Sequence, residues 1–246
     1  MTQGLYTILS NRCIAKQVYE MVLQGDTSAL RAPGQFINIA LDGFFLRRPI
    51  SVCDYEPGRL TILYKIVGRG TAYMSTLPIG AILDVLCGLG NGFDTGKSGA
   101  QPLLVGGGAG VPPMFSLAKQ LLAEGKQPIA VLGFNAADEV FYKEHFETLG
   151  IRTYIATADG SVGIRGFVTD AIAALGADAY TYYYACGPEP MLKALYQTCP
   201  TGGQLSFEER MGCGFGACMG CSCKTLYGNK RICKDGPVLD KEEILW

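Results

Sequence analysis

The stretch that decides the fold is Pro102-Leu103-Leu104-Val105-Gly106-Gly107-Gly108-Ala109-Gly110-Val111-Pro112. A short apolar run leads into glycines, and a segment with helical periodicity, Val111 to Glu124, follows at once. Strand, glycine turn and helix in this order are typical of the first unit of a dinucleotide-binding sheet. The N–H groups of the turn and the helix dipole favour a diphosphate there. The predicted cofactor-binding residues of this turn are Gly106, Gly107, Gly108 and Gly110.

Strand and helix patterns alternate on the carboxyl-terminal side of this stretch. Gly125 is expected to end the first helix, as a glycine just beyond a helix commonly does. Repeated strand–helix units predict a doubly wound parallel sheet with helices on both faces. We assign residues 96–203 to this α/β domain. Its other strands are expected at 129–132, 152–155 and 180–185, and its other helices at 139–149, 167–175 and 190–198.

The amino-terminal side has a different pattern, with short strands between turn residues. Strands are expected at 35–39, 49–52 and 60–66, and the turns carry Pro33-Gly34, Asp42-Gly43 and Pro57-Gly58. This pattern predicts an antiparallel β-barrel for residues 1–95. Residues 204–246 form a third, cysteine-rich segment that is too short for a core of its own. The chain is therefore expected to be an α+β multidomain protein.

Composition excludes several classes of function. The net charge of −1 comes without runs of like charge, so neither a nucleic acid nor an anionic membrane is expected as a partner. No apolar stretch reaches the roughly 18 residues of a membrane span, and we expect a cytoplasmic protein. His145 is the single histidine and lies in a charged stretch. Surface structure is its expected role, and histidine-based hydrolysis is excluded.

The cysteines gather near the carboxyl terminus. Cys213-x4-Cys218-x2-Cys221 followed by Cys233 has the spacing of plant-type [2Fe-2S] ferredoxins. Interleaved glycines allow a tight loop around such a cluster. The alternative is a structural zinc site, although zinc motifs favour two separated C-x2-C pairs. Cys223 is a fifth candidate ligand, and spacing favours Cys221 over it.

One segment resembles a functional motif without having its essential features. The segment Asn91 to Ser98 resembles a nucleoside-triphosphate loop, but it lacks the leading glycine and precedes no helix. We interpret Gly96-Lys97-Ser98 as part of an interdomain linker.

Three motifs in order resemble those of the ferredoxin-reductase superfamily. Arg48-Pro49-Ile50-Ser51 is similar to its R-P-x-S flavin motif, Gly106 to Pro112 to its nicotinamide-dinucleotide loop, and Cys186-Gly187-Pro188 to its C-G-P turn near the nicotinamide. The resemblance implies FAD in the barrel and NAD(H) as substrate on the sheet. The residues that it implies for FAD are Arg48, Pro49, Ile50, Ser51, Lys65, Ile66, Val67, Gly70 and Thr71. No arginine pair follows the second strand and Asp138 would repel a 2′-phosphate, so NADH is favoured over NADPH.

With the carboxyl-terminal cluster motif, the whole chain resembles the electron-transfer subunits of type B dihydroorotate dehydrogenases. That resemblance implies electron transfer between NAD(H) and a partner subunit that carries FMN and oxidises dihydroorotate, in pyrimidine (UMP) biosynthesis. It also implies a heterotetramer with two copies of each subunit, and a [2Fe-2S] cluster on Cys213, Cys218, Cys221 and Cys233. The alternatives are a paralogous subunit that couples NAD(P)H to ferredoxin or a sulfur compound, and a non-catalytic, zinc-stapled binding module.

Overall fold

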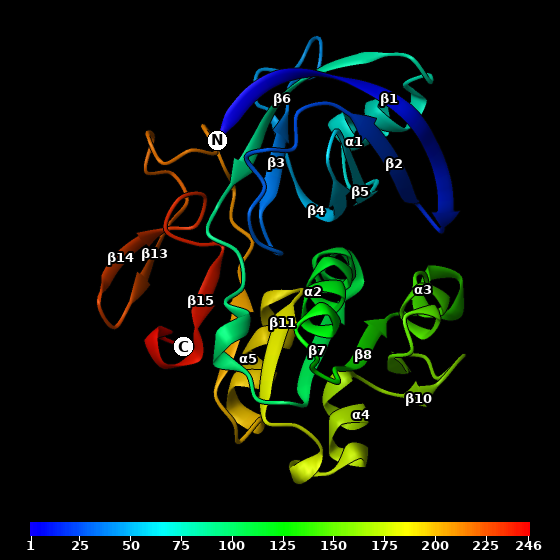
Figure 1. The fold of residues 1–246 in the computed structure, drawn as a ribbon, viewed down its shortest axis with the longest axis vertical. Helices are drawn as coiled ribbons and strands as arrows, with labels where there is room; N and C mark the ends of the chain where they lie inside the picture. Colours follow the sequence, from blue (N-terminus) through cyan, green and yellow to red (C-terminus); the bar gives the residue numbers. More distant parts are fainter.

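The computed structural model describes residues 1–246, apart from the side chain of Ala177. Figure 1 shows a barrel at the top, a helix-covered sheet below it, and a carboxyl-terminal segment in orange and red along one side of both. The predicted fold class is confirmed, because the barrel is antiparallel and closed and the sheet below it is mostly parallel.

The barrel closes in the strand order β1-β2-β5-β4-β3-β6. Its interior is filled by large apolar side chains such as Tyr6, Met21 and Ile37, none of which is exposed. Ile37 and Ile39 point inward, and the alternation of a strand places Asn38 between them on the outer face. The elements are β1 (Thr2–Ala15), β2 (Val18–Gln24), β3 (Phe36–Ile39), β4 (Arg48–Glu56), β5 (Arg59–Lys65), α1 (Arg69–Thr76) and β6 (Ile82–Leu89).

The sheet has the strand order β10-β9-β8-β7-β11-β12-β15. Its strands are β7 (Pro102–Gly107), β8 (Ile129–Phe134), β9 (Arg152–Thr157), β10 (Ile164–Arg165), β11 (Tyr182–Cys186), β12 (Gly203–Ser206) and β15 (Val238–Asp240). Its helices are α2 (Val111–Ala123), α3 (Lys143–Thr148), α4 (Val168–Leu175) and α5 (Glu189–Thr198). Short 3-10 turns lie at η1 (Thr95–Lys97), η2 (Gly108–Gly110), η3 (Ala137–Glu139), η4 (Ala177–Ala179) and η5 (Lys241–Glu243).

Two cores cover the two faces of this sheet. Leu103 and Val105 of β7 pack with α4 and α5, whereas Leu104 packs with α2 and α3 on the opposite face. The second core also takes in Val18 and Leu63 of the barrel. The barrel is therefore fixed to the sheet through buried apolar surface, which is the main source of stability in such an interface.

The carboxyl-terminal segment completes the sheet and does not fold apart from it. β15 pairs antiparallel with β12, so that Leu239 lies opposite Leu205. β12 itself spans the predicted boundary at residue 203. Between these two strands the chain forms the cysteine loop and a hairpin of β13 (Ser222–Thr225) and β14 (Gly228–Arg231).

The expected helix at 139–149 is shorter than predicted, because α3 begins only at Lys143. Phe141 and Tyr142 bury their rings in the core between barrel and sheet, and Tyr142 has a left-handed backbone with φ of 65°. That conformation cannot continue a right-handed helix. Packing of the aromatic pair therefore overrides the helical periodicity.

Among the helices of the described residues, none is long and apolar enough to cross a membrane. The linker resembling a nucleotide loop packs against the carboxyl-terminal segment instead: Lys97 forms an ion pair with Asp240 at 2.5 Å. His145 is exposed and stacks on Tyr142, with ring centroids 4.1 Å apart.

Candidate functional site

The two predicted dinucleotide turns lie side by side at the carboxyl ends of β7 and β11. These strands are parallel neighbours, and Gly106 lies opposite Cys186. The chain turns to one side of β7 through β8 and to the other side through β11 and β12. Such a point, where the strand order reverses, is where open α/β sheets bind their ligands.

Close packing explains two of the glycines in these turns. A Cβ atom at Gly110 would lie 2.0 Å from the carbonyl oxygen of Cys186, and one at Gly107 would lie 2.6 Å from Sδ of Met191. Any side chain at Gly110 would therefore drive the Gly106–Gly110 loop away from the C-G-P turn. The pair of turns acts as one unit whose exposed N–H groups suit a diphosphate.

Cys186 lies at the end of β11 inside this unit. Burial raises the pKa of its thiol to about 12, although a hydrogen bond with Ser206 opposes the shift. The thiol is therefore neutral at physiological pH, because its pKa lies far above 7. A neutral thiol packs as a small apolar group and is not a nucleophile.

The two predicted parts of the flavin site also meet. The guanidinium of Arg48 in β4 lies across Gly70 at the start of α1, and a Cβ atom at Gly70 would lie 2.1 Å from its Nε. Arg48 also stacks on Phe44, with Cζ 4.7 Å from the ring centroid. Only glycine at position 70 leaves room for this cation beside the helix N-terminus, where the dipole also favours an anion.

Local hydrogen bonds shape the turn before α1. Thr71 Oγ1 accepts hydrogen bonds from the N–H groups of Val67 at 3.0 Å and Gly68 at 3.3 Å. The side chain of Val67 is 82% exposed, and Pro49, Ile50, Ser51 and Ile66 are only half-buried. This half-covered apolar surface next to a cation suits a large aromatic ligand with a diphosphate.

Arg48→Ala is expected to lower the FAD content of the purified chain while the absorption of the cluster persists. The reason is that Arg48 supplies a planar fork of donors for a diphosphate. Absorption at the flavin and cluster bands after purification measures both. Arg59→Ala is the matched control, because Arg59 is exposed and its nearest carboxylate oxygen, on Glu56, lies 4.0 Å away. Full FAD content in Arg48→Ala would reject the assignment.

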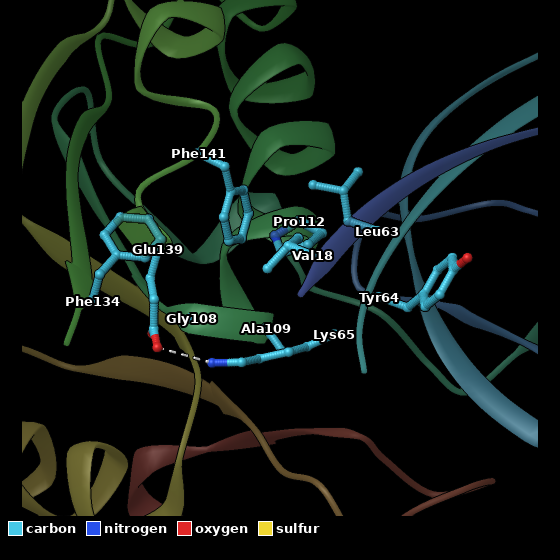
Figure 2. A pocket seen from close by; sticks show the side chains of 10 residues that line it. All are labelled: Val18, Leu63, Tyr64, Lys65, Gly108, Ala109, Pro112, Phe134, Glu139 and Phe141. Carbon is cyan, nitrogen blue, oxygen red and sulfur yellow. Dashed lines mark ion pairs between the residues drawn. The ribbon is translucent and has the colours of Figure 1, made fainter. Parts of the chain in front are cut away.

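Lys65, also predicted to contact FAD, reaches across to the sheet. Its Nζ lies 3.2 Å from Oε1 of Glu139, which follows β8. Figure 2 shows this ion pair at the edge of a small apolar pocket between Leu63 of the barrel and Pro112 and Phe141 of the sheet domain. The pocket encloses only about 10 Å³, so the pair closes a tightly packed seam.

A second ion pair crosses the same seam. Lys16 Nζ lies 2.8 Å from Asp138, the residue predicted to disfavour a 2′-phosphate, and the backbone N–H of Lys16 donates to the carbonyl of Asp138. Both partners are more than half exposed, so water screens the attraction and the pair adds little stability.

The four predicted cluster ligands lie as two pairs of thiols. Sγ of Cys213 accepts the N–H of Cys218 at 3.4 Å, and Sγ of Cys221 accepts the N–H of Cys233 at 3.4 Å. The two loops are joined where Nη1 of Arg231 donates to the carbonyl of Gly216 at 2.9 Å. Two pairs suit two irons with two thiolates each.

The loop backbone favours ionised sulfur at one end of the site. Burial opposes ionisation of Cys213, but hydrogen bonds from the N–H groups of Cys218, Phe215 and Ala217 outweigh it and lower the pKa to about 6. Burial and the neighbouring Cys221 thiol raise the pKa of Cys233 to about 12. A bound metal ion deprotonates such a thiol by its own charge, so both residues fit a cluster of positive irons.

Cys223 lies elsewhere. It is in β13, two residues beyond Cys221, and lines a separate cavity of about 350 Å³ beside Pro188, Phe207 and Trp246. Burial raises the pKa of its thiol. This position supports the choice of Cys221 as third ligand.

Comparisons with known proteins bear on all of these sites. Residues 208–245 match the family described as the iron-sulfur cluster binding domain of dihydroorotate dehydrogenase B. Residues 104–197 match the oxidoreductase NAD-binding domain. An iron-sulfur site and an NAD-binding domain, both predicted from the sequence, are thereby confirmed.

Curated relatives match over nearly the whole chain. The dihydroorotate dehydrogenase B (NAD(+)) electron transfer subunit of Fusobacterium nucleatum subsp. nucleatum is 46% identical over 245 residues, which cover 94% of each chain. The chain belongs to this family of electron transfer subunits. The family member of Geobacillus sp. (strain WCH70) is 45% identical, and the alignment covers 100% of this chain and 99% of that protein.

Solved structures place the electron transfer subunit among ferredoxin-reductase-like folds. The structure of an NADH-dependent reduced ferredoxin-NADP oxidoreductase, described with flavin-based electron bifurcation, is 29% identical with a TM-score of 0.90, covering 99% of this chain and 90% of that one. A ferredoxin NADP+ reductase from Neisseria gonorrhoeae with bound FAD and NADP shares the fold alone, at 17% identity and a TM-score of 0.70, covering 80% and 89%.

Sequence reasoning missed the residues that join the three sites of this electron transfer subunit. Glu139 crosses to the barrel, while Asn38 and Asn91 bond the barrel to the cluster segment. Asn38 is one polar residue within the apolar run Phe36–Ile39, and that exception was the only local signal. The partners lie more than 140 positions away in sequence for both asparagines, beyond the reach of a local pattern.

Proposed function

We propose that the chain passes electrons between NAD(H) and a separate, FMN-containing dihydroorotate dehydrogenase subunit, in pyrimidine (UMP) biosynthesis. NAD(H) binds at the Gly106–Gly110 and Cys186–Pro188 turns, and FAD binds at Arg48–Ser51, Lys65–Val67 and Gly70–Thr71. A [2Fe-2S] cluster is held by Cys213, Cys218, Cys221 and Cys233. The three units are the barrel at 1–95, the NAD-binding domain at 96–203 and the cluster segment at 204–246.

One observation carries this proposal: two neighbouring strands of the barrel, β3 and β4, contact the cluster segment and the NAD-binding domain. β4, which begins with the flavin motif, packs on α2, the helix that follows the dinucleotide turn. β3, the neighbour of β4, bonds through Asn38 to the first cluster ligand, Cys213. A flavin on this surface therefore has the dinucleotide on one side and the cluster on the other.

The residues of the chain bind and orient, and no proton-transfer group is required of them. Arg48 and the start of α1 hold the flavin diphosphate, and the glycine turns hold the dinucleotide. FAD, when bound, connects the two-electron chemistry of NAD(H) with the one-electron chemistry of an iron-sulfur cluster. Packing between barrel and sheet holds the flavin surface and the dinucleotide turns in a fixed relative position.

The cluster loop offers the surface for the partner. Cys218 is exposed, and the apolar side chains beside it, Phe215 and Met219, are 43% and 55% exposed. Exposed apolar residues beside a redox centre suit a protein interface more than water. We assign the FMN-containing subunit to this surface, in a heterotetramer of two copies of each subunit.

A cytoplasmic location is part of the proposal. Cys13 is exposed and free, and it is not one of the assigned cluster ligands. An exposed free thiol of this kind persists in a reducing compartment.

The visible absorption spectrum of the purified chain is the direct test. Flavin bands together with [2Fe-2S] bands are expected, and NADH should bleach both when oxygen is absent. Metal analysis should find iron and no stoichiometric zinc. A colourless, zinc-containing chain would contradict the proposal and favour the zinc-stapled binding module.

A second acceptor is favoured by one observation, the likeness over 99% of the chain to a ferredoxin-linked oxidoreductase. The paralogous function would couple NAD(P)H to ferredoxin or to a sulfur compound. The higher identity of 46% to the dihydroorotate dehydrogenase subunit favours the first proposal. Capture of the native partner, followed by an assay for dihydroorotate oxidation, separates the two.

A further inference from the structure

Asn38 is a buried amide at the junction of the flavin surface and the cluster loop. It lies in β3, directly opposite Pro49 of the flavin motif in β4, and is 1% exposed. Residues directly opposite in a sheet share a face, so the amide lies on the same outer face of the barrel as Pro49. Two residues along, Phe36 and Ser51 form the next such pair.

The amide nitrogen holds the cluster loop. Nδ2 of Asn38 donates to the carbonyl oxygen of Cys213 at 3.3 Å. The next residue, Gly214, has a φ of +80°, and a Cβ atom there would lie 2.3 Å from the same nitrogen. The loop therefore turns closely around the amide, in a conformation that glycine alone adopts without strain.

The backbone of Asn38 is itself fixed. Nη1 of Arg47 donates to the carbonyl of Asn38 at 3.4 Å, and the same guanidinium forms an ion pair with Asp84 at 2.8 Å. Arg47 therefore links the backbone of Asn38 in β3 to Asp84 in β6, and this fixes the strand that carries the amide. A side chain locked by such contacts can set the position of a loop that has little core of its own.

The amide oxygen has no partner. Oδ1 of Asn38 is buried and accepts no hydrogen bond from any described residue. Exchanging the oxygen and nitrogen of the amide does not remove the problem, because two oxygens would then face each other at Cys213. A buried acceptor without a donor is costly, and an apolar side chain at this position removes that cost together with the bond to Cys213.

We propose that Asn38 is a positioning residue that joins the flavin to the cluster. Its nitrogen holds the Cys213 turn, and its strand places that contact directly beside Pro49 of the flavin motif. The inference rests on the proposed function and deepens it. Partners behind a metal ligand orient that ligand and tune its centre, so Asn38 sets both the place of the cluster and its electronic environment relative to the flavin.

Asn91 provides a matched comparison at the other end of the cluster segment. Its Nδ2 donates to the carbonyl of Val238 at 2.8 Å, and its Oδ1 accepts the N–H of Val238 at 3.1 Å. Both asparagines therefore bond the barrel to the segment, but only Asn38 bonds a residue that is assigned as a cluster ligand. A role in simple attachment would make the two residues equivalent.

The test compares Asn38→Leu, Gly214→Ala and Asn91→Leu in the full chain with its cofactors. Asn38→Leu is expected to shift the EPR g values of the reduced cluster, because the Cys213 turn loses its bond to β3. Gly214→Ala should shift the g values as well, because a Cβ atom there would meet Nδ2 of Asn38 and push the loop and the amide apart. Asn91→Leu should lower the melting temperature and leave the g values unchanged.

Unchanged g values in Asn38→Leu would overturn the inference, as would an equal shift of the g values in Asn91→Leu. If Asn38→Leu does not fold, unchanged g values in Gly214→Ala overturn it equally well. A wild-type chain without flavin and cluster bands would reject the proposed function together with this inference. If the wild-type chain shows both flavin and cluster bands but Asn38→Leu has unchanged g values, only the role of Asn38 is rejected.

Discussion

Replacing Cys221 by serine is expected to abolish the EPR signal of the reduced [2Fe-2S] cluster. Cys221 is 2% exposed and its sulfur lies in hydrogen-bonding distance of the N–H of Cys233. An iron that loses one of its two thiolates keeps a weaker, harder oxygen ligand in its place. The measurement is EPR of the reduced, purified variant beside iron analysis of the same sample.

Cys223→Ser is the control, because the two cysteines are two residues apart and receive the same substitution. Cys223 lies in β13 and lines the cavity beside Trp246, and Cys233 is not part of that lining. Its serine variant should keep both the iron content and the signal. The opposite result, with the signal lost in Cys223→Ser and kept in Cys221→Ser, would transfer the ligand role to Cys223.

Elements that local physics decides were predicted well. The helix expected at 111–124 is observed at Val111–Ala123, and Gly125, with a φ of +76°, follows its end. β7 begins at the expected Pro102 but continues through Gly106 and Gly107, the first two residues of the glycine run, which were expected in the turn. In both places one short segment holds the whole signal: an apolar strand, a glycine that permits an unusual backbone, and a helical stripe.

Elements that depend on distant partners were not predicted. β1 extends for 14 residues because it pairs with β2 along one part and with β6 along another. β15 exists as a strand because β12, more than 30 positions earlier, offers a free edge. Register between such segments is set by tertiary packing that no local window contains.

The candidate site also has parts that the sequence predicts and parts that it does not. The motifs at Arg48, Gly106 and Cys213 are visible because phosphate and metal chemistry require particular residues at fixed spacing. Their relative placement depends on single polar contacts such as that of Asn38 with Cys213. Short sequence motifs therefore predict which cofactors bind, whereas the positions of the cofactor sites relative to one another depend on the whole fold.

The isolated chain is expected to oxidise NADH with artificial electron acceptors but not to turn over dihydroorotate. NADH gives up two electrons together, whereas an iron-sulfur cluster carries one at a time. That order is useful only if the electrons leave the chain at the exposed Cys218 end of the cluster loop. Steady-state assays with each substrate, before and after addition of the FMN subunit, make the measurement.

The chain also lacks a base for the carbon chemistry. His145 is exposed and stacked on Tyr142, and burial keeps the Cys186 thiol neutral, with a pKa of about 12. Neither suits the role of a general base, which needs a proton-accepting form and a place beside the substrate. The Cys186 thiol stays protonated, and His145 is not among the residues of the predicted cofactor sites. Addition of the FMN subunit should therefore bring dihydroorotate-dependent NAD reduction from background to the full rate of the complex. The same rate from this chain alone would show that the division of labour is wrong. Tyr227 is an exposed aromatic residue in the turn between β13 and β14, outside the cluster loop. A complex that fails to form with Phe215→Asp but forms with Tyr227→Asp would therefore locate the docking surface at the cluster loop.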